Sequence, residues 1–187
     1  MQIRNLNREE KTFAKNLTQL VWGDLYSSKS EQLQKFIYDY TFEYYDTNPE
    51  FSFGIFEDEL KGFILACLKN DCKKIHFDLD NLNKKDKFSF QELVDYVEFM
   101  SLETEKLMNE DDIFLGIFVS TKKGFGRILL QNLIQKAKQK NIKNIYLWTD
   151  SVCDFEYYDK NNFILEKKLN YFLDNKKIET MIYKKPI

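Results

Sequence analysis

One apolar run, followed at once by a glycine-containing loop and a helix, restricts the fold more than any other part of the sequence. Residues 113–120 (IFLGIFVS) are apolar almost throughout, as expected of a strand buried on both faces. Residues 120–140 (STKKGFGRILLQNLIQKAKQK) then place apolar side chains at helical spacing, and a second apolar run, NIYLWTD, follows at 144–150. Because strand–helix–strand units are right-handed and have parallel strands, we predict that residues 113–120 and 144–149 are parallel neighbours in one sheet.

The segments around this unit predict a mixed α/β fold made of one domain, residues 1–187. In chain order we expect a strand in 1–6, a helix from Arg8 to about Gly23 with Phe13, Leu17, Leu20 and Val21 on its buried face, and a second helix that Asn48-Pro49 ends. There follow a hairpin in 51–70 with its turn at 57–60, and, near the end of the chain, a short helix or turn in 153–162 and closing strands at 163–173 and 177–185. The sheet should therefore have six or seven strands, with helices on both faces.

The charge and cysteine content exclude several classes of protein. The chain has 28 basic and 30 acidic residues, so no net field marks it as a nucleic-acid or membrane-surface binder. The cysteines Cys67, Cys72 and Cys153 and the single His76 fit neither a disulfide framework nor a zinc cluster, and we expect no metal cofactor. With no apolar core of signal-peptide length and no run of 18 apolar residues, the sequence predicts a soluble protein of the reducing cytoplasm.

The loop before the long helix has the features of an anion-binding site. A strand that leads through glycines into a helix directs free backbone N–H groups and the positive end of the helix dipole at one place. Gly124 and Gly126 allow the backbone to approach a phosphate, and Lys122, Lys123 and Arg127 add positive charge. The sequence has neither the third glycine of a dinucleotide fingerprint nor the Gly-Lys-Ser/Thr of a nucleotide-triphosphate loop. The stretch favours a pyrophosphate, and a turn that only starts the helix is the alternative.

A second stretch, Tyr158-Asp159-Lys160-Asn161-Asn162-Phe163, lies beyond the next strand. Together with the glycine loop it resembles the GNAT superfamily of acyl-CoA-dependent N-acetyltransferases. In that family a strand, a loop ending in Gly-x-Gly/Ala and a helix hold the pyrophosphate of coenzyme A, and a later short helix ends in a pattern like Tyr-Glu-Lys-x-Gly-Phe. Here Asp159 replaces the Glu and Asn162 replaces the Gly, a mild change because Asn tolerates the left-handed conformation. The order of elements agrees with the family except at about 71–111.

The resemblance implies acetyl-CoA as cosubstrate, and a central parallel pair of strands that splays where the cofactor enters. It also implies that Tyr158 protonates the departing thiolate, while the backbone at Phe118 and Val119 aligns the pantetheine arm and polarises the thioester carbonyl. The implied cofactor contacts are Phe118, Val119, Lys122, Lys123, Gly124, Phe125, Gly126, Arg127, Ser151 and Tyr158. The chain departs from the family at Thr121, where Arg or Gln is usual, and at Ser151, where an Asn commonly touches the pantetheine arm.

We interpret the polar, lysine-rich residues from about 71 to 111 as an insertion in the domain. Its sequence SFQE, at 89–92, is a capping box and predicts one helix from Ser89 to about Met108. The residues expected on the buried face of this helix are Leu93, Val97, Met100 and Leu107. The helix would lie beside the acceptor entrance or in a subunit interface, or it would cover one edge of the domain.

The acceptor and the general base stay open at the level of the sequence. The implied reaction moves an acetyl group to a primary amine of a small molecule, a peptide or a protein; the alternative is a catalytically weak relative that binds acyl-CoA as a regulatory module. A homodimer is compatible with the sequence. The aromatic residues of the second helix fit either an acceptor pocket or the core, namely Phe36, Tyr40, Tyr44 and Tyr45. The candidate bases are Asp39, Glu43, Asp46, Asp111, Asp112, Asp150 and Asp154.

Overall fold

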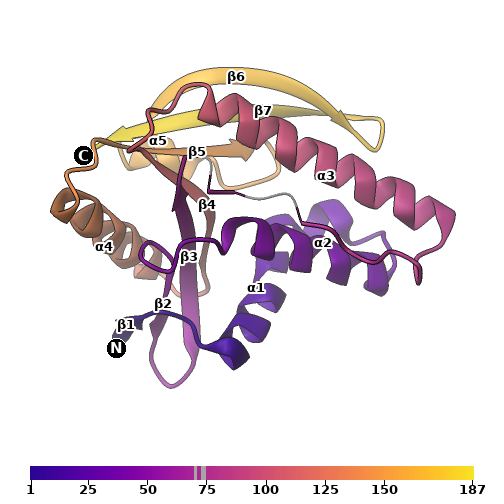
Figure 1. The fold of residues 1–187 in the computed structure, drawn as a ribbon, viewed down its shortest axis with the longest axis horizontal. Helices are drawn as coiled ribbons and strands as arrows, with labels where there is room; N and C mark the ends of the chain where they lie inside the picture. The colour runs from indigo at the N-terminus through magenta and orange to yellow at the C-terminus, as the bar shows by residue number, and fades with distance from the viewer. Residues whose placement is uncertain (70, 73–74) are drawn as a thin grey trace.

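The computed structural model of the chain describes residues 1–69, 71–72 and 75–187, without the side chains at 21 and 23–25. Within these residues seven strands form one sheet in the order β1-β2-β3-β4-β5-β7-β6 (Figure 1). The strands are β1 (Gln2–Arg4), β2 (Phe53–Phe56), β3 (Leu60–Leu68), β4 (Ile113–Ser120), β5 (Asn144–Asp150), β6 (Ile164–Leu173) and β7 (Lys176–Pro186). β4 and β5 run parallel, and the other neighbouring pairs are antiparallel. The predicted mixed sheet and its parallel pair are therefore confirmed.

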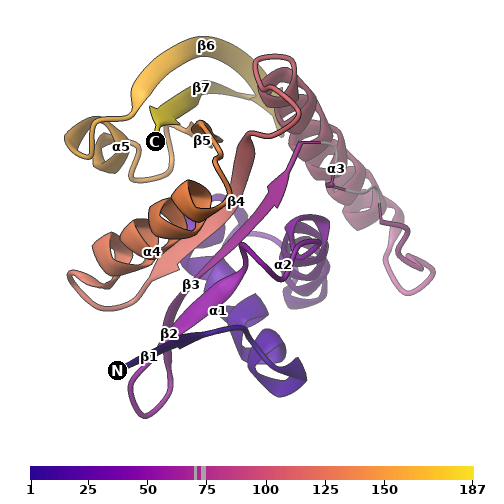
Figure 2. The ribbon, with the colours of Figure 1, turned by 60° about the vertical axis from the view of Figure 1, so that its left-hand side comes forward.

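Helices cover both faces of the sheet, as predicted. They are α1 (Arg8–Tyr26), α2 (Glu31–Tyr45), α3 (Lys84–Glu105), α4 (Phe125–Gln139) and α5 (Glu156–Lys160). Figure 2 shows α1, α2 and α3 on one side of the sheet and α4 with α5 on the other. The strands alternate accordingly, since Tyr146 and Trp148 of β5 pack with the first group of helices, while Ile145 and Leu147 pack with the second. Both faces of β5 are buried, which explains its nearly continuous apolar sequence.

The parallel pair β4–β5 is joined over a short length only. Ile113 pairs with Ile145 and Phe114 with Tyr146, and beyond these positions the two strands part. A bulge lies at the same place, since the pairing of β3 with β4 skips Gly116. A Cβ atom at Gly116 would lie 2.0 Å from Cδ1 of Tyr45, so only glycine fits against this ring. The predicted splay of the central strands is confirmed, and it opens the sheet on the C-terminal half of β4.

The helix of the 71–111 segment begins and ends earlier than predicted. α3 starts at Lys84, because the side chain of Asn83 accepts a hydrogen bond from the Asp86 N–H (2.9 Å) and caps the helix before the chain reaches the capping box at Ser89. The prediction of a start at Ser89 was therefore wrong. Leu93, Val97 and Met100 are buried as expected. Leu107 is not, since it lies beyond the end of α3 and is 36% exposed.

The first helix is longer than predicted and buries a different face. α1 continues to Tyr26 instead of ending near Gly23. Phe13 and Leu20, expected in the core, are 42% and 59% exposed, while Ala14 and Thr18 are fully buried. The smaller residues let α1 approach its neighbours closely, and the Thr18 hydroxyl is satisfied by donating to the Ala14 carbonyl (3.2 Å). The predicted position of Val21 lies outside the described side chains.

The last two strands form the predicted hairpin. Asp174 and Asn175 at its turn both have positive φ (52° and 59°), a conformation that Asp and Asn tolerate better than other side chains. The hairpin of β2 and β3 likewise turns within residues 57–59, as expected. None of the described helices combines the length and the apolar character needed to cross a lipid bilayer.

Candidate functional site

A cavity of about 620 Å³ lies where β4 and β5 part. Its walls come from the C-terminal half of β4, the loop and first turn of α4, the end of β5, the residues up to α5, and α1. The lining residues are Leu20, Trp22, Gly116, Ile117, Phe118, Val119, Ser120, Thr121, Lys122, Lys123, Gly124, Gly126, Arg127, Trp148, Thr149, Val152, Cys153, Asp154, Tyr157 and Tyr158. The structure thus brings together most of the residues that the sequence suggested for a cofactor site.

Phe125 and Ser151 are the two suggested cofactor residues that do not line the cavity. The Phe125 ring is buried in the core beneath α4, and its N–H donates to the Lys122 carbonyl (3.1 Å). The side chain of Ser151 is exposed, and its N–H donates to the Glu179 carbonyl (2.9 Å). Phe125 therefore anchors the glycine loop, and neither amide is free for a ligand.

The start of α4 is an open helix N-terminus. Gly124 stands at the N-cap with φ of 89°, in the left-handed region that glycine reaches without strain, and no side chain caps the helix. Among the described residues, the N–H groups of Lys123, Gly124, Gly126 and Arg127 have no hydrogen-bond acceptor. Four open donors and the helix dipole at one cavity wall form a cradle for an anion.

The cations at this wall differ in their availability. The Lys122 ammonium is 2.6 Å from a Glu57 carboxylate oxygen and lies over the Phe125 ring, so it is already paired. No carboxylate within the described part of the chain forms an ion pair with Lys123 or Arg127. Lys123 and Arg127 are therefore the two cations that can pair with phosphate oxygens.

Gly126 lets the helix start lie close to β4. A Cβ atom at this position would be 3.3 Å from Cζ of Phe118, a tight contact against a ring that itself lines the cavity. A larger side chain would have to displace Phe118 or project toward the open amides. The two glycines therefore do different work: Gly124 supplies the positive φ, and Gly126 supplies space.

Two adjacent tyrosines line the cavity from α5. Tyr158 packs its ring against Phe163 (5.3 Å between centroids) and Tyr183 (5.6 Å), and burial raises the pKa of its hydroxyl. Asn162 holds φ of 59°, so it takes the left-handed conformation that the family pattern gives to glycine. The Tyr157 ring packs on Phe118 (5.5 Å), and its buried hydroxyl has no partner among the described residues.

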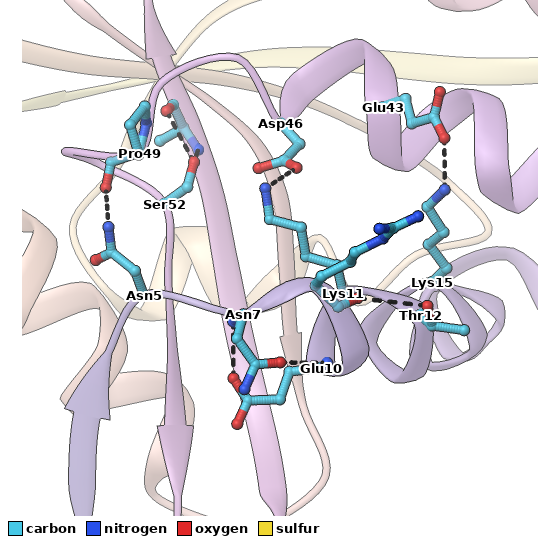
Figure 3. A network of polar contacts seen from close by, with 12 residues as sticks. Asn5, Asn7, Glu10, Lys11, Thr12, Lys15, Glu43, Asp46, Pro49 and Ser52 are labelled. Atoms are coloured by element: carbon cyan, nitrogen blue, oxygen red, sulfur yellow. Dashed lines mark hydrogen bonds and ion pairs between the residues drawn. The ribbon is translucent and has the colours of Figure 1, made fainter.

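Most of the candidate bases lie away from the cavity. Figure 3 shows Glu43 and Asp46 bound by lysines of α1: Lys15 donates to Glu43 (2.5 Å) and Lys11 to Asp46 (2.5 Å). Asp39 also pairs with Lys15, at 3.6 Å. These carboxylates join α2 to α1 and are already neutralised by their partners.

The carboxylates near the two ends of β4 and β5 have distinct surroundings. Asp112, which is 1% exposed, lies at the start of β4 and accepts from the Asn109 N–H and the Asn144 amide, both at 2.8 Å. Asp111 is exposed beside it. Both lie at the end of β4 opposite to the cavity-lining residues. Of the predicted candidates only Asp154 lines the cavity, and its side chain is exposed.

Asp150 is fully buried at the end of β5, close to the lining residues Thr149 and Val152. Its carboxylate accepts hydrogen bonds from the Tyr96 hydroxyl (3.0 Å) and the Val152 N–H (3.1 Å), yet burial raises the pKa of Asp150 above the usual range. Burial also raises the pKa of the Cys153 thiol, and the neighbouring Asp150 carboxylate raises it further. The thiol is therefore protonated and a weak nucleophile.

One wall of the cavity was not predicted from the sequence. Leu20 and Trp22 of α1 face Trp148 and Val152 from the other end of the chain. Trp22 stacks on Trp148 with ring centroids 6.4 Å apart and an angle of 26° between planes. The only sequence signal was a helical spacing that assigned Leu20 to the core. The aromatic residues expected for either role on α2 belong to the core instead, since Tyr40, Tyr44 and Tyr45 are buried and Phe36 packs against the same cluster.

Comparisons with known proteins identify the fold. No family model matches the sequence, and no curated protein matches it. Among solved structures, the C-terminal condensation domain of Ebony in complex with β-alanyl-dopamine is 12% identical, with 100% of this chain and 98% of that chain covered and a TM-score of 0.66. A GNAT-family protein from Desulfovibrio desulfuricans is 9% identical (99% and 98% covered, TM-score 0.59). Aminoglycoside 6′-acetyltransferase type Ii is 17% identical (100% and 97% covered, TM-score 0.56). The chain has the fold of the GNAT acetyltransferases.

Proposed function

We propose that this chain, a single domain with the GNAT acetyltransferase fold, is an N-acetyltransferase that moves an acetyl group from acetyl-CoA directly to a primary amine. The observation that carries the proposal is that one cavity has both the open amides of the α4 start and Tyr158 in its walls. The amides suit a pyrophosphate, and the tyrosine supplies a proton to a leaving thiolate.

The residues present fit coenzyme A. The open N–H groups of Lys123, Gly124, Gly126 and Arg127 and the charges of Lys123 and Arg127 would hold the pyrophosphate. β4 has no β5 partner beyond Phe114, so its edge at Phe118 and Val119 is open to strand-like hydrogen bonds with the amides of a pantetheine arm. The thioester would then lie between the splayed strands, in the part of the cavity that Tyr158 also lines.

The chain's own groups account for the proton transfers. As the amine nitrogen bonds to the thioester carbon, the carbon–sulfur bond breaks and the negative charge moves to sulfur. Burial keeps the Tyr158 hydroxyl protonated, so it can donate to the sulfur as this charge develops. The amine loses a proton in the same reaction, and we assign its removal to Asp154, directly or through water, because Asp154 lines the cavity.

The state of Cys153 supports direct transfer. A covalent route would need a thiolate in the cavity to accept the acetyl group first. The only cysteine among the described lining residues is Cys153, and its raised pKa keeps it as a thiol. We therefore expect an intersecting-line kinetic pattern for the two substrates and no acetylated cysteine.

The test measures binding and turnover separately. Calorimetry should detect acetyl-CoA binding, and a thiol reagent should detect coenzyme A release that depends on an added amine. The panel would contain an aryl-alkylamine, an alkylamine, a lysine peptide and an aminoglycoside, the last because one protein of similar fold is an aminoglycoside acetyltransferase. Acetyl-CoA binding with no release on any amine would favour the non-catalytic acyl-CoA-binding module. A protein that does not bind acetyl-CoA would contradict the proposal.

A further inference from the structure

The part of the cavity away from the glycine loop is walled by large apolar side chains that are accessible to a ligand. Leu20 and Val152 are 59% and 48% exposed, Trp22 is half-buried, and Trp148 is 8% exposed and forms the floor beneath them, and all four line the cavity. Apolar side chains that gather at one hollow mark a ligand or partner surface, whereas scattered ones have no such meaning. We call Leu20, Trp22, Trp148 and Val152 the apolar wall.

The Trp148 ring of this wall presents only carbon to the cavity. The single polar atom of Trp148, Nε1, donates to the Tyr45 hydroxyl at 3.0 Å, and that hydroxyl lies 3.1 Å from Ser101 in the core. Trp22 stacks on Trp148 from the side of α1, and Tyr96 of α3 packs its edge against Trp148 (5.3 Å between centroids). The Trp148 ring is thus fixed by contacts on three sides and cannot turn its N–H toward a ligand.

Charge divides the cavity into two parts. Lys123 and Arg127 lie with the open amides, which suit an anion. Among the described lining side chains the one carboxylate is Asp154, next in sequence but one to Val152 of the apolar wall. A polycationic or sugar-like amine would need several acceptors to replace its lost water, and this lining offers few of them.

Resting on the acetyl-transfer function proposed above, we infer that the acceptor is a primary amine carried on an aromatic or branched aliphatic body, such as an aryl-alkylamine. The body packs on the apolar wall, and the amine points toward Asp154 and the thioester. The whole cavity, which in this proposal also holds the cofactor, has a volume of about 620 Å³, so the space left for the body of the acceptor is that of a small molecule.

Tryptophan fluorescence gives a direct test of this inference that does not depend on turnover. The chain has two tryptophans, Trp22 and Trp148, and both belong to the apolar wall. 2-Phenylethylamine, added to protein loaded with coenzyme A, should change this fluorescence saturably, whereas ethanolamine at the same concentration should not. In the thiol-release assay we expect kcat/KM for 2-phenylethylamine to exceed that for ethanolamine by about 10-fold or more, the scale of discrimination that an apolar pocket provides.

Two substitutions on α1 distinguish a specific role of the apolar wall from a general effect on the helix. Leu20→Ser should lower kcat/KM for 2-phenylethylamine by about 10-fold, and should change the value for ethanolamine and the acetyl-CoA Kd by less than about twofold, because the side chain is largely exposed. Phe13→Ser is the matched control, since Phe13 is also an exposed apolar residue of α1 but does not line the cavity.

Each outcome separates this inference from the proposed function. Equal or better use of an aminoglycoside, a lysine peptide or ethanolamine would overturn the inference and leave acetyl transfer intact. The same loss in Leu20→Ser and Phe13→Ser would also overturn it. Saturable binding of 2-phenylethylamine without acetyl transfer would support the apolar wall and contradict the proposed function, and the absence of both would contradict the two together.

Discussion

The two parts of the cavity are built from different components of the chain. The part proposed for the cofactor, here called the cofactor part, consists largely of backbone from one continuous segment that runs from the end of β4 into α4. The part proposed for the acceptor, here called the acceptor part, consists of side chains that come from α1, β5 and the residues before α5. Backbone amides bind any phosphate placed against them, whereas side chains determine which amine fits. The comparison predicts that changes to the first part alter cofactor affinity, and that changes to the second alter the choice of acceptor.

The largest expected effect is at Tyr158, to which our proposal gives a role in the reaction and not in the binding of either substrate. Tyr158→Phe removes one hydroxyl and keeps the ring contacts with Phe163 and Tyr183. We expect kcat to fall by about 10²- to 10⁴-fold, or about 3 to 5 kcal/mol of barrier, with little change in acetyl-CoA affinity. Steady-state kinetics and calorimetry measure the two quantities.

Tyr157→Phe is the matched control for this prediction. The Tyr157 hydroxyl is buried without a partner among the described residues, so its removal should leave the free energy of unfolding unchanged or slightly raised. If Tyr157→Phe lost as much turnover as Tyr158→Phe, the assignment of the acid to Tyr158 would be wrong. Wild-type turnover in Tyr158→Phe would have the same consequence.

The next largest effect is expected at Gly116, where β4 bulges and parts from β5. A Cβ atom at Gly116 would lie 2.0 Å from the Tyr45 ring, which is fully buried and holds Trp148 in place. Gly116→Ala should therefore lower the free energy of unfolding by about 1 to 3 kcal/mol or more, the usual cost of overpacking a core. Urea denaturation followed by circular dichroism measures it.

Gly124→Ala offers a comparison in which the steric term is absent. A Cβ at Gly124 meets nothing within 4 Å, so the expected loss is only the cost of a positive φ, about 1 to 2 kcal/mol. A smaller loss of stability in Gly116→Ala than in Gly124→Ala would show that the Tyr45 ring moves aside at little cost. It would contradict a rigid contact between Gly116 and Tyr45.

A change of similar size is expected in the cofactor part, but in the free energy of acetyl-CoA binding instead of the free energy of unfolding. Gly126→Val places a branched side chain between Phe118 and the open amides, since even its Cβ would be 3.3 Å from Phe118 Cζ. We expect acetyl-CoA binding to weaken by about 1 to 3 kcal/mol, or about 5- to 150-fold in Kd. The binding of 2-phenylethylamine by tryptophan fluorescence should change much less. An unchanged Kd in a folded variant would remove the phosphate role of the glycine loop.

The sequence predicted the elements around the glycine loop better than the apolar wall, for a physical reason. The glycine loop and the YDKNNF stretch are local, and their conformations follow from the residues present: Gly124 and Asn162 both adopt positive φ. The parallel pairing of β4 and β5 follows from the handedness of strand–helix–strand units. Such features need no knowledge of what packs against them.

The apolar wall depends on tertiary contacts that no local pattern contains. Helical spacing placed Leu20 in the core, but Ala14 and Thr18 take the buried face of α1 because their size allows close packing. Trp22 and Trp148 meet only after α1 has packed on the sheet. The prediction for the start of α3 failed for a related reason. The capping pattern at Ser89 is present in the sequence, but Asn83 already caps the helix upstream of it.

The smallest expected effect concerns Asp150, whose titration should change the stability of the structure around the apolar wall. Asp150 is buried behind this wall, facing Tyr96 of α3, Tyr26 of α1 and the Cys153 thiol, and burial raises its pKa above the ordinary value of 3.8. The folded protein therefore binds this proton more tightly than the unfolded chain does. Its stabilising contribution is complete below pH 3.8 and is lost as the pH rises through the raised pKa.

Asp150→Asn keeps the shape of the side chain and removes this titration. The free energy of unfolding of the wild type, measured relative to that of Asp150→Asn by urea denaturation at a series of pH values, should fall as the pH rises from about 4 and then level off. Acetyl-CoA affinity should follow the same course in both proteins, because Asp150 does not line the cavity. A difference in stability that grows with pH would mean that the hydrogen bonds from Tyr96 and Val152 outweigh burial and lower the pKa of Asp150. A buried carboxylate anion would then stabilise the structure around the apolar wall, and the contribution of Asp150 to the free energy of unfolding would rise with pH instead of falling.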